Sequence, residues 1–321
     1  MSDLPPALRA AIDRELEGVP RKGLADRARA TSEAYRAGKP SAGVIREADD
    51  ALAYALTRLP ATYAACAAVF AEAARMAPAF RPGRVLDVGA GTGGASWAAH
   101  ATWMGIATAT WVDSNPAFLA LAARLAAGTP LAAAQAKQAD LTIHADWPAA
   151  DLAVASYVLA ELAPNAQATV VQALWAATEG VLALVEPGTP AGYARILAAR
   201  TGLIAAGARI VAPCPHEAAC PLAAPDWCHF SIRLARSRDH RLAKGADVPF
   251  EDERFAYLLA ARPSVVMDAR GPRILAPPRA GKPGIDLKLC GPEGLEQRFV
   301  ARRDKLAYAA ARRLGWGDTL P

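Results

Sequence analysis

Three glycines and an acidic residue follow a short apolar run in the first third of the chain. Asp87 precedes Gly89, Gly91 and Gly93, and the β-branched run Arg84–Val88 is typical of a buried parallel strand. The glycines let the backbone turn tightly and let a ligand approach the peptide groups, while the Asp87 carboxylate could reach a ligand hydroxyl or amine. A dinucleotide site would read G-x-G-x-x-G with an acid about 20 residues later. The spacing G-x-G-x-G argues against a nicotinamide cofactor, with an ordinary strand–turn–helix as the simpler alternative.

This glycine spacing resembles the first motif of class I S-adenosylmethionine (SAM) methyltransferases. Asp113 ends the second expected strand, 26 residues after Asp87, where it would bind a ribose diol or cap the next helix. Asp140 and Leu141 follow the third expected strand and would meet an adenine edge. The fourth expected strand ends at the ligand cleft, where Ser156 would line the cofactor site and two residues would orient a methyl acceptor: Tyr157 and Glu161.

Four of the five cysteines lie in the C-terminal part of the chain and could share one metal site: Cys214, Cys220, Cys228 and Cys290. Thiolates suit Zn²⁺ or an iron–sulfur cluster. The spacing C-x5-C-x7-C lacks the C-x2-C pairs of zinc ribbons and disfavours ordinary zinc, although His216 or His229 could replace one thiol in a zinc site. Four unlinked buried cysteines are the alternative. An odd cysteine count without a secretory signal argues against a disulfide framework, and Cys66 is interpreted as a small core residue.

Alternating strands and helices between residue 84 and about 190 predict a parallel, doubly wound sheet. Four proline-punctuated helices are expected before it: Ala7–Leu16, Gly23–Ala37, Glu47–Leu59 and Ala61–Met76. After it, Asp286–Cys290 and Arg298–Arg302 predict a small β module. The predicted fold class is α/β, with an N-terminal helical region (1–80), a Rossmann-like SAM-binding domain (81–205) and a basic, cysteine-containing, β-rich C-terminal module (206–321).

The charge is unevenly distributed along the chain. Residues 1–190 hold 15 basic and 18 acidic residues, whereas residues 191–321 hold 21 and 13. The basic part is either a surface for a polyanion such as RNA or a solvated surface without a partner. The same two alternatives apply to the basic run within Ser231–Lys244, where Glu251 and its neighbours could also pair with it. Without an apparent signal peptide or apolar membrane span, a monomeric cytoplasmic protein that does not bind membranes is expected.

Five segments together resemble one family: LDVGAGTG (86–93), ASYVLAEL (155–162), VEPGTPAG (185–192), VAPCPH (211–216) and DWCHFS (226–231). It is the methyltransferase-like family of the mitochondrial ribosomal small subunit and its bacterial relatives, and the resemblance covers roughly residues 40 to 310. The resemblance implies a SAM-binding fold, action on small-subunit ribosomal RNA or a pre-small subunit, and a role in assembly. It also implies a [4Fe–4S] cluster on Cys214, Cys220, Cys228 and Cys290, with zinc as the alternative metal.

The family resemblance leaves two functions open. The first is SAM-dependent methylation of small-subunit ribosomal RNA, with the sulfonium methyl transferred in line and orientation supplying most of the rate. The second is a non-catalytic assembly factor that binds RNA, SAM and the cluster. The chain retains Asp87 and all three motif glycines but lacks the Asn/Asp-Pro-Pro-aromatic motif common in amine methylases of nucleobases.

Overall fold

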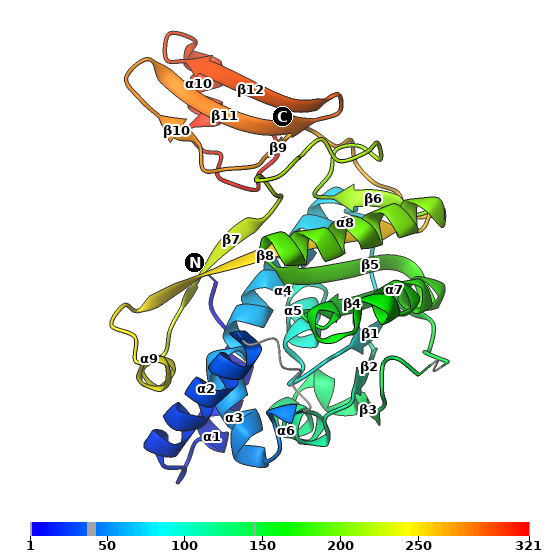
Figure 1. Cartoon of the computed structure of the whole chain (residues 1–321), viewed down its shortest axis with the longest axis vertical. Coiled ribbons are helices and arrows are strands. Elements are labelled where there is room, and N and C mark those ends of the chain that lie inside the picture. The colour runs from blue at the N-terminus through cyan, green and yellow to red at the C-terminus, as the bar shows by residue number, and fades with distance from the viewer. Residues whose placement is uncertain (1, 37–42, 144–145, 321) are drawn as a thin grey trace.

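The N-terminal helical region consists of four helices that pack beside a central sheet in the computed structural model, which describes residues 2–36, 43–143 and 146–320 (Figure 1). Each of the four predicted helices is confirmed within about two residues at its described ends, and Ala37, the predicted end of the second, lies outside the described residues. The prolines of α1 and α4 stand in their first turns, where a missing backbone N–H costs nothing. The observed bounds are α1 Pro6–Glu15, α2 Arg21–Arg36, α3 Ala48–Thr57 and α4 Leu59–Met76.

An eight-stranded sheet forms the centre of the molecule, in the order β3-β2-β1-β4-β5-β8-β6, with β7 paired to β8. Strands β1 to β5 run parallel to one another, and β8 runs antiparallel to β5, β6 and β7. The α/β, Rossmann-like class is therefore confirmed. The strand bounds are β1 Arg84–Val88, β2 Thr108–Asp113, β3 Gln135–Gln138, β4 Ala150–Ser156, β5 Thr178–Pro187, β6 Arg209–Ala212, β7 Phe230–Ala235 and β8 Phe250–Ala261.

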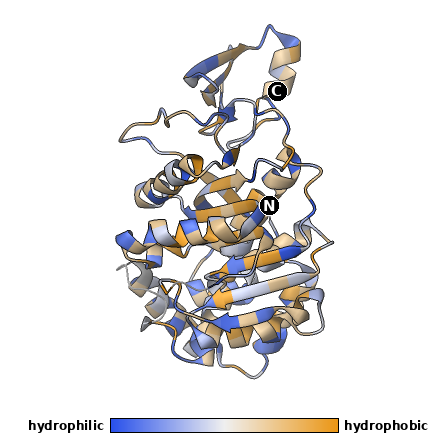
Figure 2. Ribbon diagram, turned by 90° about the vertical axis from the view of Figure 1, so that its right-hand side faces the viewer, coloured by the Kyte–Doolittle hydropathy of each residue, from blue (hydrophilic) through white to orange (hydrophobic). Residues whose placement is uncertain are grey.

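Helices cover both faces of this sheet and bury its alternating apolar side chains (Figure 2). On one face α4, α5 and α6 enclose a core that includes Trp111 and Phe70, and α7 and α8 cover the other face. The connecting elements are α5 Gly94–Thr102, α6 Pro116–Ala126, η2 Pro130–Ala133, η3 Leu159–Glu161, α7 Pro164–Ala177, α8 Pro190–Ala205 and α9 Arg238–Lys244. Within the described ranges, none of the helices has the length and apolarity needed to cross a membrane.

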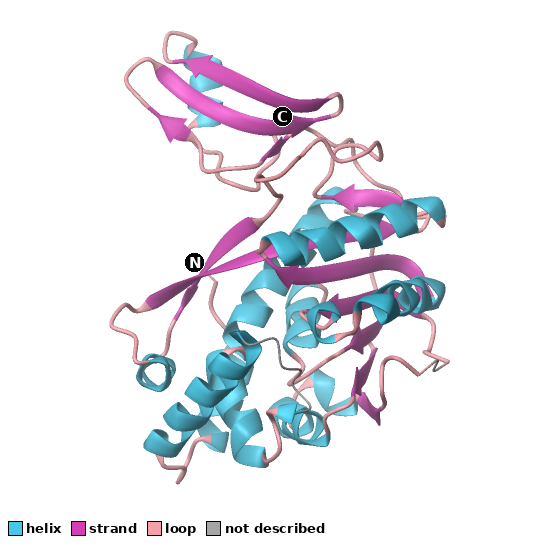
Figure 3. Cartoon of the chain, viewed as in Figure 1, coloured by secondary structure: helices cyan, strands magenta, loops and turns pink. Residues whose placement is uncertain are grey.

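A second, four-stranded sheet stands apart from the central one at the C-terminal end (Figure 3). It contains β9 Arg273–Ile274, β10 Arg279–Ala280, β11 Gly284–Gly291 and β12 Gly294–Ala301, and α10 Lys305–Ala311 follows it. The antiparallel pair β11–β12 confirms the predicted small β module. We call β9 to β12 with α10, residues 273–313, the C-terminal module.

The predicted boundary between residues 205 and 206 is wrong, because it cuts through the central sheet. Strands β6 and β8 lie beyond it but pair with each other, and β8 pairs with β5. The first half of β8 is charged and forms a hairpin with β7, whereas its second half, Phe255–Ala261, is continuously buried. That charged start hid a core strand from the sequence pattern.

Candidate functional site

The predicted glycine loop joins β1 to α5 and has the backbone conformation that requires glycine. Gly89, Gly91 and Gly93 adopt φ values of 70°, 54° and 83°. A Cβ atom added to Gly89 would lie 2.5 Å from the Val158 side chain, so no larger residue fits there. A Cβ atom added to Gly91 would meet no described atom within 4 Å. The loop is thus tightly packed at its start and open at Gly91, where a ligand could approach the backbone.

Asp87 lies fully buried beneath this loop with half of its carboxylate unpartnered. Its Oδ2 accepts hydrogen bonds from the Ser96 backbone N–H (3.1 Å) and hydroxyl (2.7 Å), and Ser96 accepts one from Trp111. Its Oδ1 has no hydrogen-bond partner among the described residues. Burial raises the pKa of Asp87 to about 6. An unpartnered carboxylate oxygen beside a glycine loop suits the ammonium group of an amino-acid ligand.

Asp113 ends β2 beside the same loop and organises its backbone. Its carboxylate accepts hydrogen bonds from the backbone N–H groups of Gly91 (2.7 Å) and Asn115 (2.8 Å). Asn115, rather than Asp113, caps α6, since its side chain accepts from two N–H groups of the first turn. Burial raises the pKa of Asp113. Asp113 is therefore placed at a strand end from which an acidic side chain can bind a ribose.

Asp140, Leu141 and Ser156 also follow strands at this edge of the sheet, but they differ in exposure. Asp140 is exposed and accepts hydrogen bonds from the Thr142 backbone and hydroxyl, which lower its pKa. Leu141 packs into the core under α7, and Ser156 is buried at the end of β4. Because β1 to β4 run parallel, the ends of β3 and β4 lie at the same edge of the sheet as the glycine loop.

The two predicted catalytic residues have different environments. Tyr157 follows β4 with a φ of 61°, and its hydroxyl donates a 2.8 Å hydrogen bond to Glu253 of β8. Burial and Glu253 together raise the Tyr157 pKa well above its ordinary value. Glu161 ends η3, is half-buried and interacts electrostatically with Tyr54 of α3. The Tyr157 hydroxyl is therefore bound to β8, and the side chains of Tyr157 and Glu161 are both half-buried.

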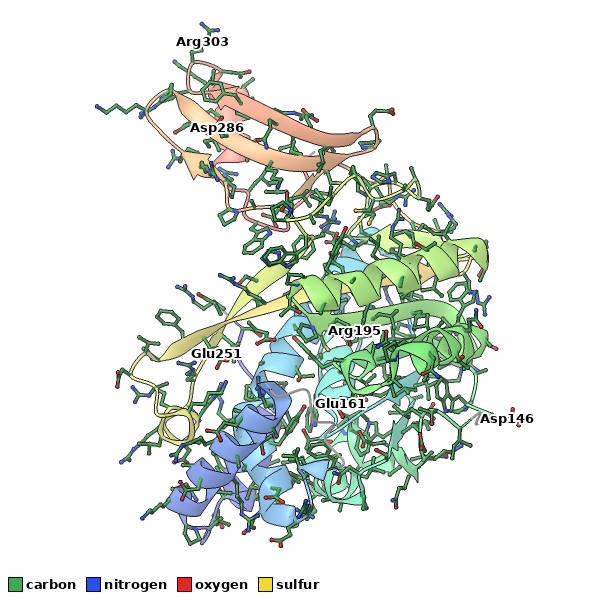
Figure 4. All side chains as sticks on the ribbon, in the orientation of Figure 1. Asp146, Glu161, Arg195, Glu251, Asp286 and Arg303 are labelled. Atoms are coloured by element: carbon green, nitrogen blue, oxygen red, sulfur yellow. The ribbon has the colours of Figure 1, made fainter. Side chains whose placement is uncertain are left out.

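Glu186 has a role that the sequence did not predict, although the strand ending in Glu186 was expected. It is fully buried at the end of β5, accepts from the Leu159 N–H and pairs with Arg195 of α8 at 2.6 Å. Burial raises the pKa of Glu186 to about 7 despite this partner. Figure 4 shows Arg195 on α8 above the strand ends. Glu186 thus holds η3, which contains Glu161, against the sheet.

The four C-terminal cysteines line one cavity between α8, β8 and the C-terminal module. Three come from the loop between β6 and β7, and Cys290 comes from β11, 62 residues after Cys228. The cavity has an empty volume of about 510 Å³ including open solvent, and it is also lined by Tyr193, Arg200, Tyr257 and Arg273. None of the four forms a disulfide. The four cysteines thus share one cavity while remaining free thiols.

The cavity combines thiols with buried cations. Burial raises the pKa of Cys290 to about 12 and raises that of Cys228 well above its ordinary value, with neighbouring thiols adding to both shifts. Arg200 and Arg273 are buried and act in the opposite direction on Cys214. The Tyr193 hydroxyl lies 3.2 Å from the Cys220 sulfur, and His216 Nε2 lies 3.6 Å from the Cys290 sulfur. The sequence pattern identified His216 beside these cysteines but not Tyr193, Arg200 and Arg273, which come from two distant segments, α8 and β9.

Among the residues that the structure describes, no group of three or more acidic, cysteine or histidine side chains is close enough to hold a metal ion. Four thiolates on a zinc ion would be about 3.8 Å apart, given a Zn–S distance of about 2.3 Å. A [4Fe–4S] cluster instead presents a separate iron to each thiolate, so its ligands stand farther apart around a larger body. The four thiols line one cavity, and their donor chemistry fits either of these groups. His229 stacks on Trp227 and contacts Trp316, which leaves it outside the cavity lining.

The basic run in Ser231–Lys244 divides between β7 and α9 and is largely neutralised. Arg233 pairs with Asp252, and Arg236 and Lys244 both pair with Glu251. The partners of all three are on β8, as the acidic residues there suggested. This run is therefore a weaker polyanion surface than its composition indicates.

Comparisons with known proteins place the chain near ribosomal proteins. The family model described as mitochondrial small ribosomal subunit Rsm22 matches residues 48–321. The human mitochondrial ribosome assembly protein METTL17 is 32% identical over 289 residues, which are 84% of this chain and 62% of that protein. The mitochondrial Rsm22-cox11 tandem protein 2 of Schizosaccharomyces pombe is 29% identical over 184 residues, 44% of this chain and 24% of that protein. The chain thus spans less than two thirds of either relative's length.

The solved structures that resemble this chain do so only weakly. Magnesium protoporphyrin IX methyltransferase from Synechocystis PCC 6803, with bound SAH, is 14% identical and covers 75% of this chain and 99% of its own, with a TM-score of 0.41. That similarity is too low to support an argument about function.

The expected cytoplasmic location is wrong. The matching family and the relatives are mitochondrial by description, which points to mitochondria instead. The expectation rested on the absence of a recognisable targeting segment, and such an absence does not identify a compartment.

Proposed function

Because the chain belongs to the Rsm22 family of the mitochondrial small ribosomal subunit, we propose that it acts in small-subunit assembly as a SAM-binding, methyltransferase-like protein on small-subunit ribosomal RNA. Its partner is the RNA or the immature subunit, and the protein acts as a monomer. The human relative's name, a ribosome assembly protein, supports the assembly role. The observation that carries SAM binding is the unpartnered Oδ1 of Asp87 beneath the open glycine loop.

In this proposal each strand end holds one part of SAM. Asp87 accepts from the ammonium group, the backbone of Gly89, Gly91 and Gly93 faces the amino-acid part, and Asp113 binds the ribose. Asp140 and Leu141 meet the adenine, and Ser156 lines the remaining side of the site. Bound SAM would supply an electrophilic methyl group on a sulfonium. The protein then needs to orient the acceptor, for which Tyr157 and Glu161 are the two candidates.

A non-catalytic assembly factor is the second candidate, and Tyr157 favours it. The Tyr157 hydroxyl, a candidate for orienting an acceptor, donates to Glu253 of β8. A site in which this hydroxyl is already bound to β8 is better suited to binding SAM than to positioning a nucleobase. An experiment is therefore needed to distinguish methylation of RNA from assembly without methylation.

The test begins with SAM binding and continues to methyl transfer. Isothermal titration of the wild-type protein with SAM should give a stoichiometry of one, and Asp87→Asn should weaken binding at least tenfold because the amide cannot pair with an ammonium. Immature small subunits incubated with labelled SAM should then acquire label in their RNA. No label, together with rescue of assembly by Asp87→Asn in a deletion strain, would establish the non-catalytic function. Absence of SAM binding to the wild-type protein would contradict the proposed site.

We further propose that Cys214, Cys220, Cys228 and Cys290 bind a [4Fe–4S] cluster that fastens the C-terminal module to the central sheet. Support comes from the shared cavity, the lack of disulfides, and the buried Arg200 and Arg273, whose positive charge would offset that of a thiolate-ligated cluster. Binding requires thiolates, so loading should release protons from the thiols.

Elemental analysis separates the cluster from zinc. Protein purified without oxygen should contain about four irons and four acid-labile sulfides per chain. Cys290→Ser should lose both. Cys66→Ser, at a buried position within α4 and outside the cavity, should keep them and serves as the matched control. One zinc per chain would replace the cluster with a simpler structural site.

A further inference from the structure

The chain's excess of positive charge is concentrated in the C-terminal module. Residues 273–313 hold ten basic and four acidic residues, a net charge of +6, against +5 for the whole chain. Three of the ten are neutralised, because Arg273 pairs with Glu72, Lys288 with Asp226 and Arg298 with Glu296. The other seven are exposed and form no ion pair within the described ranges: Arg279, Lys282, Arg302, Arg303, Lys305, Arg312 and Arg313.

One face of the module's sheet is open at its outer end. The register pairs Arg279 with Asp286 and Asp286 with Phe299, so these three side chains share a face. The other face carries Ile285, Leu287, Leu289 and Val300, which pack against residues of α10 and the C-terminal segment. Phe299 is 51% exposed. At the inner end of the open face, Lys288 pairs with Asp226 of the loop between β6 and β7, which we call the cysteine loop, and Cys290 lines the cavity. Only the outer end of this face is therefore left uncovered by the cysteine loop.

Basic side chains border this exposed aromatic residue at the tip of the sheet. The Arg302 N–H donates to the Pro283 carbonyl at 2.8 Å, which places Arg302 beside the β10–β11 turn that contains Lys282. Arg303 follows directly, and Figure 4 shows it at the outermost end of the module, directed away from the protein. Leu306, 87% exposed, begins the helix behind this tip.

We propose that this surface, formed by Arg279, Lys282, Phe299, Arg302 and Arg303, binds single-stranded RNA. The inference rests on the proposed function, which names ribosomal RNA as the partner, and assigns the contact to one surface. Unpaired basic side chains suit phosphates, and an exposed aromatic ring stacks on an unpaired base. Asp286 repels phosphate beside Phe299, so the phosphates bind the arginines and lysine at the tip while a base stacks on the ring.

A single strand fits this surface better than a duplex or an acidic protein. Bases within a duplex are already stacked on one another and are not available to Phe299. An acidic protein would use the cations but would gain little from an exposed ring between them. The basic run of β7 and α9 is a weaker competing surface, since three of its five cations are paired with Glu251 and Asp252.

The test compares two RNA probes on the full-length protein prepared without oxygen. Fluorescence anisotropy with a 12-nucleotide oligouridine and a 12-base-pair RNA duplex measures binding across a salt series. Phe299→Ala should weaken oligouridine binding about tenfold and leave duplex binding within about twofold, because stacking on an aromatic ring contributes about 1–3 kcal/mol per base. Phe299→Trp, which keeps a stacking surface, should restore the affinity.

The charge variants test the tip. Arg302→Glu with Arg303→Glu should reduce the slope of log affinity against log salt by about 1.4, the expected value for two phosphate contacts on a single strand. The matched control reverses two exposed charges of the N-terminal helices, Arg14→Glu with Lys22→Glu, and should leave the slope unchanged. Wild-type protein that binds neither probe at low salt would contradict the proposed function.

If the wild type binds and the tip and control variants behave alike, the proposed function stands and this surface assignment is wrong. Equal losses of single-stranded and duplex binding in Phe299→Ala would also overturn the stacking role. A tip variant that binds RNA normally but no longer binds an acidic polypeptide such as polyglutamate would assign the surface to a protein partner instead.

Discussion

The glycine-loop site and the cysteine cavity hold their functional groups by different means. In the first, strand ends of one continuous sheet place Asp87 and Asp113, and backbone or hydroxyl donors already satisfy most of their oxygens. In the second, a loop and a strand from a separate sheet bring four thiols around a cavity, and repulsion between neighbouring thiolates adds to burial in raising their pKa values. The first site is complete without its ligand except for one carboxylate oxygen.

This difference determines whether ligand binding at a site also stabilises the folding of the segments that form it. A site built on a sheet keeps its geometry whether or not a ligand is present, so ligand binding there contributes only its own affinity. A site whose ligands lie on separate segments contributes its binding free energy to the folding of those segments. The cavity should therefore determine whether the C-terminal module is fixed in place, and the glycine loop should not.

Removal of the bound group from the cavity should produce the largest effect. Stripping the proposed cluster should destabilise the C-terminal module by about 4 kcal/mol or more, because structural metal sites contribute that much or more to folding. Hydrogen exchange at the amides of Leu287 and Leu289 in β11 should accelerate about a thousandfold, while Leu86 in β1 keeps its protection. Unchanged exchange in β11 would show that the protein alone holds the module, and the contrast between the two sites would disappear.

Two glycine substitutions test whether the glycine loop is as rigid as the contrast with the cavity requires. Gly89→Ala places a Cβ atom 2.5 Å from Val158 at a φ of 70° and should destabilise the protein by about 3 kcal/mol. Gly91→Ala has a φ of 54° but open space, and should cost about 1 kcal/mol from backbone strain alone. Urea denaturation of the apo proteins measures both. Equal costs would indicate that the loop shifts to relieve the Val158 contact and is less rigid than its packing suggests.

The sequence predicted the glycine-loop site better than the cavity, for a physical reason. The elements around Asp87 and Asp113 are consecutive strands and helices, so periodicity and glycine spacing along a short segment describe them. The four helices, five parallel strands and the β11–β12 pair followed from such local patterns. Asn115 rather than Asp113 caps α6, but that exchange moved the cap by two residues and left Asp113 at the strand end.

The remaining features depend on contacts between distant segments. Arg200 and Arg273 lie beside the cysteines because α8 and β9 meet there, 73 residues apart in the chain. Glu253 reaches Tyr157 only because β8 inserts into the central sheet, and a charged first half concealed that strand. No local pattern carries this information. The pairing of the basic run in β7 and α9 differs, because the acidic residues that follow it closely in the chain, from Glu251 on, already indicated it.

Asp87→Asn should separate stability from ligand binding at the glycine loop. The folded pKa of about 6 lies above the ordinary 3.8, so the folded state holds this proton more tightly than the unfolded state. That stabilisation is complete below pH 3.8 and is lost as the pH rises through 6. At pH 8 the neutral amide should therefore make the apo protein more stable by about 2 kcal/mol, while SAM binding falls.

The difference between Asp87→Asn and wild type should shrink toward pH 4, where both side chains are neutral. Chemical denaturation at pH 4.5 and pH 8 measures it, with Ser96→Ala as a control that removes a hydrogen-bond donor to the same carboxylate. A variant that is less stable than wild type at pH 8 would mean that the unpartnered oxygen is satisfied in solution. The glycine-loop site would then be complete without a ligand, unlike the cavity, which is expected to need a bound group.

The ion pair between Lys288 of β11 and Asp226 of the cysteine loop should have the smallest effect. It joins two segments that also contribute cysteines, yet the two side chains are 29% and 45% exposed. Lys288→Met and Asp226→Asn should each cost less than about 1 kcal/mol, and a double-mutant cycle should give a coupling of about 0.5 kcal/mol that falls with salt. A coupling above about 1 kcal/mol in the cluster-free protein would mean that the polypeptide itself clasps the loop to β11. We expect a group bound to the thiols to fix both segments. A Lys288–Asp226 coupling free energy that is weak and does not change on cluster loading would therefore agree with the contrast between the cavity and the glycine-loop site.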